Sequence, residues 1–391
     1  MRVLVLATRF PVPPWRGDQL RLYHHLRLLA QRHEVALAAL VLRPPRAAAR
    51  VAVEGLGVRV EVVPLGLLGA GVSLGRALLG DPRPLQVLMY ARRRARARVD
   101  ALLAGGGFDV VHAQLVRTAP YLPPPAGPPA VVDLVDALSV NLGRRAALAR
   151  GPGARLAAWE ARRLARFERA LLGRAAATLV VSEADRAAVG SAHARVVPNG
   201  VDIAHFAYRE EGRPAARLVF AGNLGYFPNV DAACWLAEEV FPRICAEVPA
   251  ATLRLVGARP ARAVRRLAAR PGISVAASVP AMPPELAAAT VALIPMRAGS
   301  GMQNKVLEAM ACGTPVVTTP RAATPLAARA GEHLLVADDA AGLAAAAVAL
   351  LRDPARARTL GRAARALVER RYRWEDSAAA VEAAWEASRG F

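Results

Sequence analysis

The segment Pro295–Val317, PMRAGSGMQNKVLEAMACGTPVV, decides the fold. An apolar run leads into the glycine loop Gly299–Gly301, and a helical pattern follows from about Met302 to Cys312. A glycine and a proline then end the helix before a second apolar run. Strand, glycine loop, helix and strand in this order predict one repeating unit of a parallel α/β sheet.

The same alternation of strand and helix continues in both directions along the chain. We predict helices at about Asp18–Arg32 and at Ala232–Phe241, among others. The predicted strands are Arg2–Ala7, Val35–Leu42, Val58–Val63, Val110–His112, Val131–Asp133 and Thr178–Val181 in the first half, and Leu218–Gly222, Thr252–Val256, Ile273–Val275, Val291–Pro295 and Pro315–Thr318 in the second. Such alternation indicates parallel sheets covered on both faces.

The pattern restarts after the segment FAYREEGRPAA at Phe206–Ala216, which indicates two Rossmann-like α/β domains joined by a linker. We predict an N-terminal domain at residues 1–205, a linker at 206–216, a C-terminal domain at 217–368 and a C-terminal helix at 369–391.

The composition narrows the classes of function. The chain has 391 residues, 54% of them apolar, and a net charge of +21. This apolar content excludes a disordered chain, while the charge indicates nucleic acid, an anionic membrane surface or a phosphorylated small molecule as partner. Arginine accounts for all the basic residues except Lys305. We ascribe the arginine excess to a GC-rich genome, so the one lysine is the more informative residue.

The basic run YARRRARAR at Tyr90–Arg98 leaves two interpretations open. It is either a solvated helix face or a surface for anionic lipids, where each base contributes about 1 kcal/mol. Aromatic-interleaved basic motifs and helix-turn-helix signatures are missing, so we expect no nucleic-acid partner. Cys234, Cys245 and Cys312 lack CxxC spacing, and no apolar stretch reaches the roughly 20 residues of a membrane span. We expect a cytoplasmic protein, with peripheral location at the inner membrane face left open.

Lys305 and Glu308 lie three residues apart and hence on one face of the predicted helix. A glycine loop that opens onto a helix offers unpaired N–H groups to a pyrophosphate. A lysine near that helix start adds positive charge, and a carboxylate further along can accept hydrogen bonds from two ribose hydroxyls. The alternative is a surface ion pair worth about 0.2–0.5 kcal/mol.

Polar residues also follow strands in the first half. Gly17 and Asp18 stand at the start of a helix, where they either approach a ligand or form a turn with an Asp18 N-cap. His112 ends a strand, and one interpretation is a core histidine that hydrogen-bonds to backbone groups. Asp133 and Asp136 end another, where they orient acceptor hydroxyls, act as a base or cap a helix. Their DxxD spacing and the lack of a His/Asp cluster predict no metal. Because the first turn is not GxGxxG, we also expect no nicotinamide cofactor.

Three segments together resemble glycosyltransferase family 4, the retaining nucleotide-sugar enzymes of the GT-B fold. They are VPNGVD at Val197–Asp202, LVFAGN at Leu218–Asn223 and KVLEAMACGTPVV at Lys305–Val317. The stretches PPWRGDQLRLYHHLRLLAQRHEV and FAGNLGYFPNVDAACWLAEEVFP are similar to the bacterial sugar transferases associated with exopolysaccharide and exosortase loci. The resemblance covers essentially the whole chain.

The resemblance implies an α/β protein with two Rossmann-like domains whose parallel sheets face a central cleft, and a C-terminal helix that crosses back to the N-terminal domain. It implies retaining, metal-independent transfer of a sugar from a nucleotide-diphosphate sugar to a sugar, lipid-linked or small-molecule hydroxyl acceptor. Exopolysaccharide, glycolipid or glycoconjugate synthesis is the expected context, with no cofactor. A nucleotide-sugar epimerase of the same fold and a basic nucleic-acid-binding protein are the alternatives.

The resemblance also implies roles for residues of the second half. Glu308 matches the second glutamate of the family's E-x7-E motif, which binds the donor ribose, whereas Ser300 replaces the first. The family's Gly-Arg…Lys pair is replaced here by Gly222 and Asn223. Lys305 is therefore the residue expected to carry the positive charge that binds the donor diphosphate. Further donor contacts are expected from Arg297, Gly299, Gly301, Met302 and Gln303.

In the first half, Gly17 with Asp18 matches the family's glycine loop near the donor phosphates and the acceptor. His112 matches the family histidine near the donor sugar. With Lys305, Asp133 and Asp136, it completes the set of residues expected to be catalytic.

Overall fold

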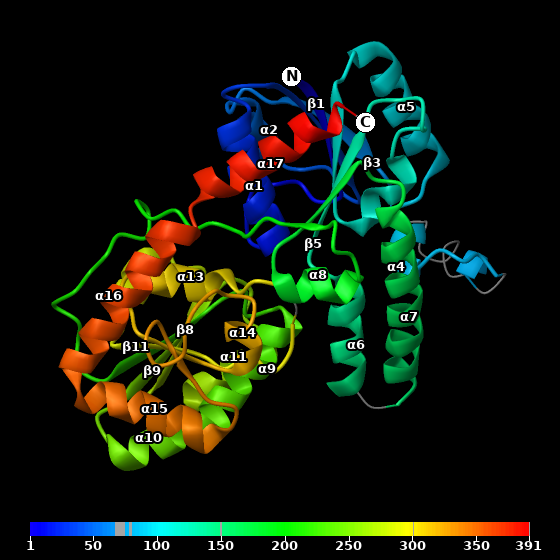
Figure 1. Ribbon diagram of the computed structural model, residues 1–391. Coiled ribbons are helices and arrows are strands. Elements are labelled where there is room, and N and C mark those ends of the chain that lie inside the picture. The colour runs from blue at the N-terminus through cyan, green and yellow to red at the C-terminus, as the bar shows by residue number, and fades with distance from the viewer. Residues whose placement is uncertain (67–74, 78–79, 149–150, 300, 391) are drawn as a thin grey trace. The chain divides into compact units, whose positions relative to one another are not determined.

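The computed structural model describes residues 1–66, 75–77, 80–148, 151–299 and 301–390. The chain divides into two compact units (Figure 1). The first comprises Met1–Pro198 together with the residues from Ser377 onward, and the second comprises Asn199–Asp376. Each unit is an α/β layer structure with its own parallel sheet.

The first unit is built on a parallel sheet of seven strands in the order β3-β2-β1-β4-β5-β6-β7. The strands are β1 (Arg2–Ala7), β2 (Glu34–Val41), β3 (Arg59–Pro64), β4 (Val110–Gln114), β5 (Ala130–Val135), β6 (Ala177–Val180) and β7 (Arg195–Val196). The strand order reverses between β1 and β4, which pair with Leu6 opposite Ala113. In open α/β sheets ligands bind at the carboxyl ends of the strands beside such a switch point.

Helices cover this sheet because successive side chains of a strand point to opposite faces. Val3 and Val5 of β1 belong to the apolar cluster between the sheet and the helices on one face. Leu4 and Leu6 belong to a second cluster on the other face, so the sheet has an apolar core on each side. The helices of the unit are α1 (Gly17–Leu29), α2 (Ala47–Glu54), α4 (Leu85–Leu88), α5 (Arg93–Gly106), the 3-10 helix η1 (Val116–Tyr121), α6 (Leu138–Leu148), α7 (Pro152–Leu172) and α8 (Glu183–Val189).

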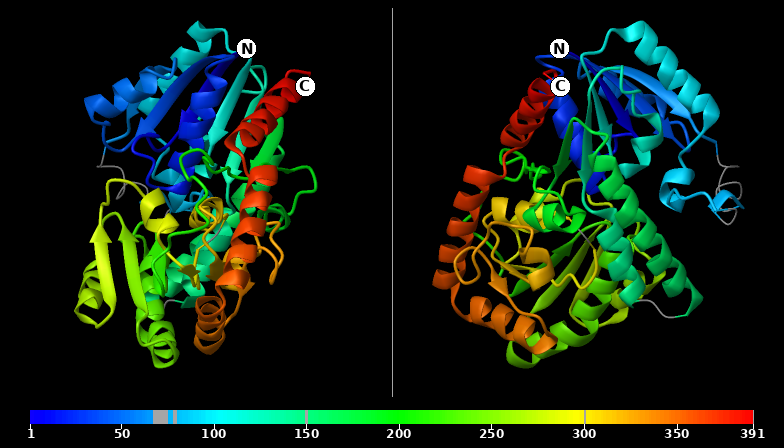
Figure 2. Two further views of the ribbon diagram at one scale, coloured as in Figure 1. Left: turned by 90° about the vertical axis from the view of Figure 1, so that its left-hand side faces the viewer. Right: turned by 45° about the vertical axis from the view of Figure 1, so that its right-hand side comes forward.

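Helices α6 and α7 lie side by side as a hairpin (Figure 2). Glu168 of α7 is buried, and its carboxylate accepts hydrogen bonds from the backbone N–H and the hydroxyl of Ser139 in the first turn of α6. Burial raises the pKa of Glu168 to about 7, although the hydrogen bonds from Ser139 oppose that shift. The carboxylate thus satisfies a backbone donor that the helix itself leaves unpaired.

The last helix, α17 (Trp374–Ser388), completes the core of the first unit. Val381 and Trp385 belong to the same apolar cluster as Val3 and Val5 of β1. The hydroxyl of Ser377 bonds His25 Nε2 at 2.9 Å and donates to the Pro198 carbonyl at 2.7 Å.

The second unit has a parallel sheet of six strands in the order β10-β9-β8-β11-β12-β13. Its strands are β8 (Arg217–Ala221), β9 (Thr252–Gly257), β10 (Ile273–Ala277), β11 (Val291–Ile294), β12 (Val316–Thr318) and β13 (Leu335–Val336). Its helices are α9 (Phe227–Trp235), a π-helical segment (Leu236–Val240), α10 (Phe241–Glu247), α11 (Arg262–Arg266), a 3-10 turn (Leu267–Ala269), α12 (Pro283–Ala287), α13 (Asn304–Ala311), α14 (Pro320–Ala323), α15 (Ala340–Arg352) and α16 (Pro354–Arg371). The strand order reverses between β8 and β11, which makes their carboxyl ends the switch point of this sheet.

Every predicted strand is present, with bounds that shift by a few residues, but the short strands β7 and β13 were not predicted. The predicted helix Ala232–Phe241 is wrong in its extent. Helix α9 begins at Phe227, because Pro228 occupies the first turn, where its missing N–H costs nothing. A π-helical segment then joins it to α10, which also carries a proline in its first turn.

Candidate functional site

In the second unit, the predicted donor residues gather at the carboxyl ends of β8 and β11. The loop after β11 leads into α13, and the loop after β8 leads into α9. Gly299 and Gly301 have φ angles of 104° and 66°, in the region that glycine adopts without strain. Ser300 lies outside the described residues. Because α13 begins at Asn304, the positive end of its helix dipole lies directly after this loop.

Lys305 is the second residue of α13, and its ammonium is held by neutral groups. Nζ donates to Asn229 Oδ1 at 2.7 Å and to Gln303 Oε1 at 3.1 Å, and lies 3.5 Å from Met296 Sδ. Burial lowers the pKa of Lys305 to about 8, although the charge of Glu308 opposes the shift. Among the described residues, the partners that these bonds give the ammonium are all uncharged.

The alternative interpretation of Lys305 and Glu308 as a surface ion pair is wrong. Within the part of the chain that the structure describes, no carboxylate forms an ion pair with Lys305. Burial raises the pKa of Glu308 to about 7, and the charge of Lys305 opposes that rise. The two groups therefore act on each other through space, and the Glu308 carboxylate can accept hydrogen bonds from hydroxyl groups.

Asn229 was not identified from the sequence, although it organises this site. Its side chain is 5% exposed, accepts from Lys305 and donates through Nδ2 to the Asn223 carbonyl at 2.9 Å. A Cβ on Gly222 would meet Asn229 Nδ2 at 3.0 Å and Lys305 Cε at 3.2 Å, which explains the glycine. Gly222 therefore lies beside Lys305, and the Asn223 carbonyl is bonded by the same Asn229 side chain. An asparagine within a helix start gives no sequence signal of this role.

Two other predicted donor residues have different surroundings. The Arg297 guanidinium forms a two-point ion pair with Asp231, with distances of 2.7 and 3.1 Å, and lies 4.7 Å from the centre of the Trp235 ring. Its charge is thus already engaged by α9. Met302 is 8% exposed and contributes its backbone, rather than a polar side chain, to the loop.

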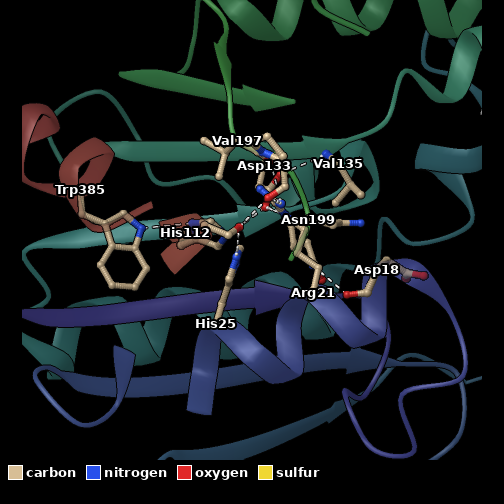
Figure 3. A network of polar contacts seen from close by, with 12 residues as sticks. Asp18, Arg21, His25, His112, Asp133, Val135, Val197, Asn199 and Trp385 are labelled. Carbon is tan, nitrogen blue, oxygen red and sulfur yellow. Dashed lines mark hydrogen bonds and ion pairs between the residues drawn. The ribbon is translucent and has the colours of Figure 1, made fainter. Parts of the chain in front are cut away.

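In the first unit, His112 lies in β4 and is 3% exposed (Figure 3). Its Nδ1 accepts a hydrogen bond from Trp385 Nε1 at 3.1 Å, and its Nε2 lies 3.8 Å from Asp133 Oδ2. Burial lowers the pKa of His112 to about 4, although Asp133 opposes that shift. The imidazole is therefore neutral near pH 7, with the proton on Nε2 assigned from this network.

Asp133 forms a buried ion pair with Arg21 of α1, a residue that was not identified from the sequence (Figure 3). Both side chains are 0% exposed, and Arg21 Nε donates to Asp133 Oδ2 at 2.7 Å. Arg21 Nη1 also donates to the Val197 carbonyl at 2.9 Å. Asp133 Oδ1 accepts from the backbone N–H of Val135 at 3.1 Å. Asp133 thus links α1 to the end of β5.

The loop after β1 holds the other predicted residues of this unit. Gly17 begins α1, and Asp18 lies within its first turn, so the alternative of an Asp18 N-cap is wrong because Arg16 occupies that position. Asp18 accepts from Arg9 Nη1 at 2.7 Å, and its carbonyl accepts from Gln114 Nε2 at 3.0 Å. Asp136 follows β5 and is half-buried.

The basic run Tyr90–Arg98 leads into α5, which begins at Arg93, and several of its arginines are bonded within the unit. Arg96 donates to the Pro120 and Leu122 carbonyls, and Arg98 pairs with Glu61. Arg93 and Arg94 are exposed. None of the described helices combines the length and apolar character that crossing a membrane requires. Over the same residues, no three His, Cys, Asp or Glu side chains are grouped as metal ligands.

Two protein-family models match the sequence. "Glycosyl transferase 4-like domain" matches residues 18–200, and "Glycosyl transferases group 1" matches residues 215–353. Together they span most of the chain. A comparison with curated proteins gives no match.

Solved structures resemble the whole chain. They include HepE from Anabaena in complex with UDP and glucose, at 16% identity, a TM-score of 0.69 and coverage of 98% of both chains. Sucrose-phosphate synthase from Thermosynechococcus elongatus is 16% identical, with a TM-score of 0.74 and coverage of 99% of this chain and 98% of that one. A Rickettsia africae glycosyltransferase is 8% identical, with a TM-score of 0.65 and coverage of 99% and 98%. The chain has two Rossmann-like units, and its similarity to these structures confirms the predicted GT-B fold.

Proposed function

This chain belongs to the glycosyltransferase family that the two models describe, and from that premise we propose that it transfers a sugar from a nucleotide-diphosphate sugar to a hydroxyl acceptor. The observation that carries the proposal is the surroundings of Lys305, whose ammonium is bound by Asn229 and Gln303 beside a glycine loop and a helix start. HepE was solved with UDP and with UDP-glucose, which supports a uridine nucleotide as donor.

Lys305 is proposed to stabilise the departing diphosphate. When the bond from the anomeric carbon to the diphosphate breaks, negative charge develops on the phosphate oxygens. An ammonium and backbone N–H groups fixed beforehand stabilise that charge without having to reorganise. With a pKa of about 8, Lys305 is mostly protonated at pH 7. We propose that Gly299, Gly301 and Met302 supply the backbone contacts, and that this protein charge makes a metal ion unnecessary.

Glu308 is proposed to hold the donor ribose. Its carboxylate lies on the same helix as Lys305, and binding of two hydroxyls would favour the ionised form that burial disfavours. Ser300 stands where the family has its other glutamate, so the sugar hydroxyls are proposed to bind the amides of Gly301 and Gln303 instead.

The first unit is proposed to bind the acceptor and to support the donor sugar. Asp136 is the candidate for orienting or deprotonating the acceptor hydroxyl, because Asp133 is fully buried and paired with Arg21. We assign Asp133 the role of positioning β5 and neutral His112. Gly17 and Asp18 are proposed to lie near the phosphate groups of the donor. Retention of anomeric configuration, and a place in polysaccharide, glycolipid or glycoconjugate synthesis, are proposed from the family resemblance.

The proposal is tested with a panel of nucleotide-diphosphate sugars. Release of free nucleoside diphosphate is measured with and without candidate hydroxyl acceptors and with EDTA, while proton NMR reads the anomeric configuration of the product. We expect acceptor-dependent release, a retained anomer and full rates in EDTA. A donor converted into another nucleotide sugar without acceptor would identify an epimerase and contradict the proposal. Loss of activity in EDTA would contradict metal independence alone.

A further inference from the structure

A second basic site lies at the switch point of the first sheet. Arg9 follows β1 after Thr8, and Arg117 follows β4 as the second residue of η1. Strands β1 and β4 are direct neighbours, and η1 packs against β1. The two arginines therefore stand at the carboxyl ends of the two strands between which the strand order reverses, where open α/β sheets bind their ligands.

The Arg117 guanidinium has only neutral partners. Nε and Nη2 both donate to Gln86 Oε1, at 3.1 and 2.8 Å, and the group lies 5.5 Å from the centre of the Tyr90 ring. Throughout the described residues, no carboxylate forms an ion pair with it. Burial lowers the pKa of Arg117, and the charge of Arg9 lowers it further. A cation that is largely removed from water is energetically unfavourable unless an opposite charge pairs with it. The surroundings of Arg117 therefore favour binding of an anion.

The described carboxylates near Arg117 do not form an ion pair that would neutralise its guanidinium. Asp18 is held by Arg9 through a 2.7 Å ion pair, with the Asp18 side chain 10% exposed. Asp136 affects Arg117 only through space and more weakly than burial does. Thr8 is 4% exposed, and its hydroxyl has no hydrogen-bond partner among the residues that the structure describes. A buried hydroxyl without a partner is unfavourable, and an oxygen-rich ligand would supply that partner.

Two residues of the first unit with positive φ angles lie at the carboxyl ends of β4 and of its neighbour β5. Leu115 and Val135 have φ angles of 68° and 64°, although neither is glycine. Leu115 directly follows β4, Val135 ends the neighbouring strand β5, and the Leu115 N–H donates to the Asp133 carbonyl at 2.7 Å. Such conformations are strained for residues other than glycine, and they cluster at functional sites. Here they set the backbone that leads into Arg117 and Asp136.

We propose that Arg117, with Arg9 and Thr8, forms a subsite for a phosphate group on the acceptor. The inference rests on the proposed function, since the same unit is assigned the acceptor. An arginine fork matches two phosphate oxygens. Asp136 follows the neighbouring strand β5, and the proposed function assigns it to the hydroxyl of the acceptor. The acceptor is thus a phosphate-bearing alcohol, rather than a neutral sugar.

Binding of sn-glycerol 3-phosphate, of glycerol and of UDP is measured by titration calorimetry at constant ionic strength. The proteins are the wild type, Arg117→Gln and the control Arg93→Gln, which removes one exposed arginine from α5 of the same unit. We expect glycerol 3-phosphate to bind the wild type and the control alike, and Arg117→Gln about tenfold or more weakly, while UDP affinity stays within about twofold. Glycerol is expected not to bind.

Three results would contradict the proposed subsite. Arg93→Gln could lose as much affinity for glycerol 3-phosphate as Arg117→Gln, Arg117→Gln could lose none, or the wild type could fail to bind glycerol 3-phosphate at about 10 mM. A parallel loss of UDP affinity in Arg117→Gln would assign the arginine to the donor diphosphate instead. If Arg117→Gln does not fold, Arg117→Lys and Arg9→Gln decide the question with the same titrations. Failure of UDP to bind even the wild type would contradict the uridine nucleotide proposed as the donor, while the glycerol 3-phosphate titrations still test the subsite.

Discussion

Raising the pH should weaken the binding of UDP through one residue, Lys305. Burial lowers the pKa of this lysine to about 8, so its ammonium loses its proton in a range where ordinary lysines keep theirs. Between about pH 7.5 and pH 9 the protonated fraction falls from roughly three quarters to roughly one tenth. If the diphosphate binds only the ammonium form, UDP affinity should fall about eightfold over this range.

The assay is titration calorimetry of UDP across this range at constant ionic strength, with Lys305→Arg as the control. A guanidinium stays protonated throughout, so the variant should lose the pH dependence even if its planar fork binds the diphosphate less well. A flat wild-type profile would refute the role of Lys305. An equal loss of affinity in Lys305→Arg would assign the pH dependence to another group.

Three further predictions concern stability. Asp133→Asn should lower the free energy of unfolding by about 3–5 kcal/mol, because it leaves the Arg21 guanidinium buried without its carboxylate; a change below about 1 kcal/mol in urea unfolding would contradict this. Glu168 has a folded-state pKa raised from 4.5 to about 7, so its contribution is greatest at low pH and is lost as the pH rises through 7. Glu168→Gln should therefore remove part of the fall in melting temperature between about pH 5 and pH 8, and an unchanged profile would count against it. Gly257→Ala should lower the melting temperature, because a Cβ there would lie 1.6 Å from the Gly222 carbonyl oxygen; a melting temperature equal to that of the wild type would show that the two loops can separate.

The sequence predicted both sheets because their strands are apolar, β-branched runs placed between helical patterns and turns. It did not predict β7 or β13, since two-residue strands carry no such pattern. The extent of α9 was wrong because prolines at Pro228 and Pro242 are compatible with the first turn of a helix as well as with a loop.

For the site, Lys305 could be identified because it is the one lysine of the chain, and Glu308 through its place in a motif. Asn229 and Arg21 could not. Asn229 meets Lys305 across 76 positions, and Arg21 meets Asp133 across 112, so neither partner is visible from local spacing. Arg21 also lies beside leucines on a helix face of an arginine-rich chain, where it resembles any solvated arginine.

The central claim is that Lys305 stabilises the departing diphosphate, and steady-state turnover of Lys305→Ala tests it most directly. Nucleoside diphosphate release is measured with saturating donor and acceptor, and the melting temperature verifies that the variant is folded. We expect kcat to fall by about a hundredfold or more, as when a positioned group that stabilises developing charge is removed, with little change in melting temperature. A folded Lys305→Ala variant whose kcat stays within about threefold of the wild type would contradict the claim.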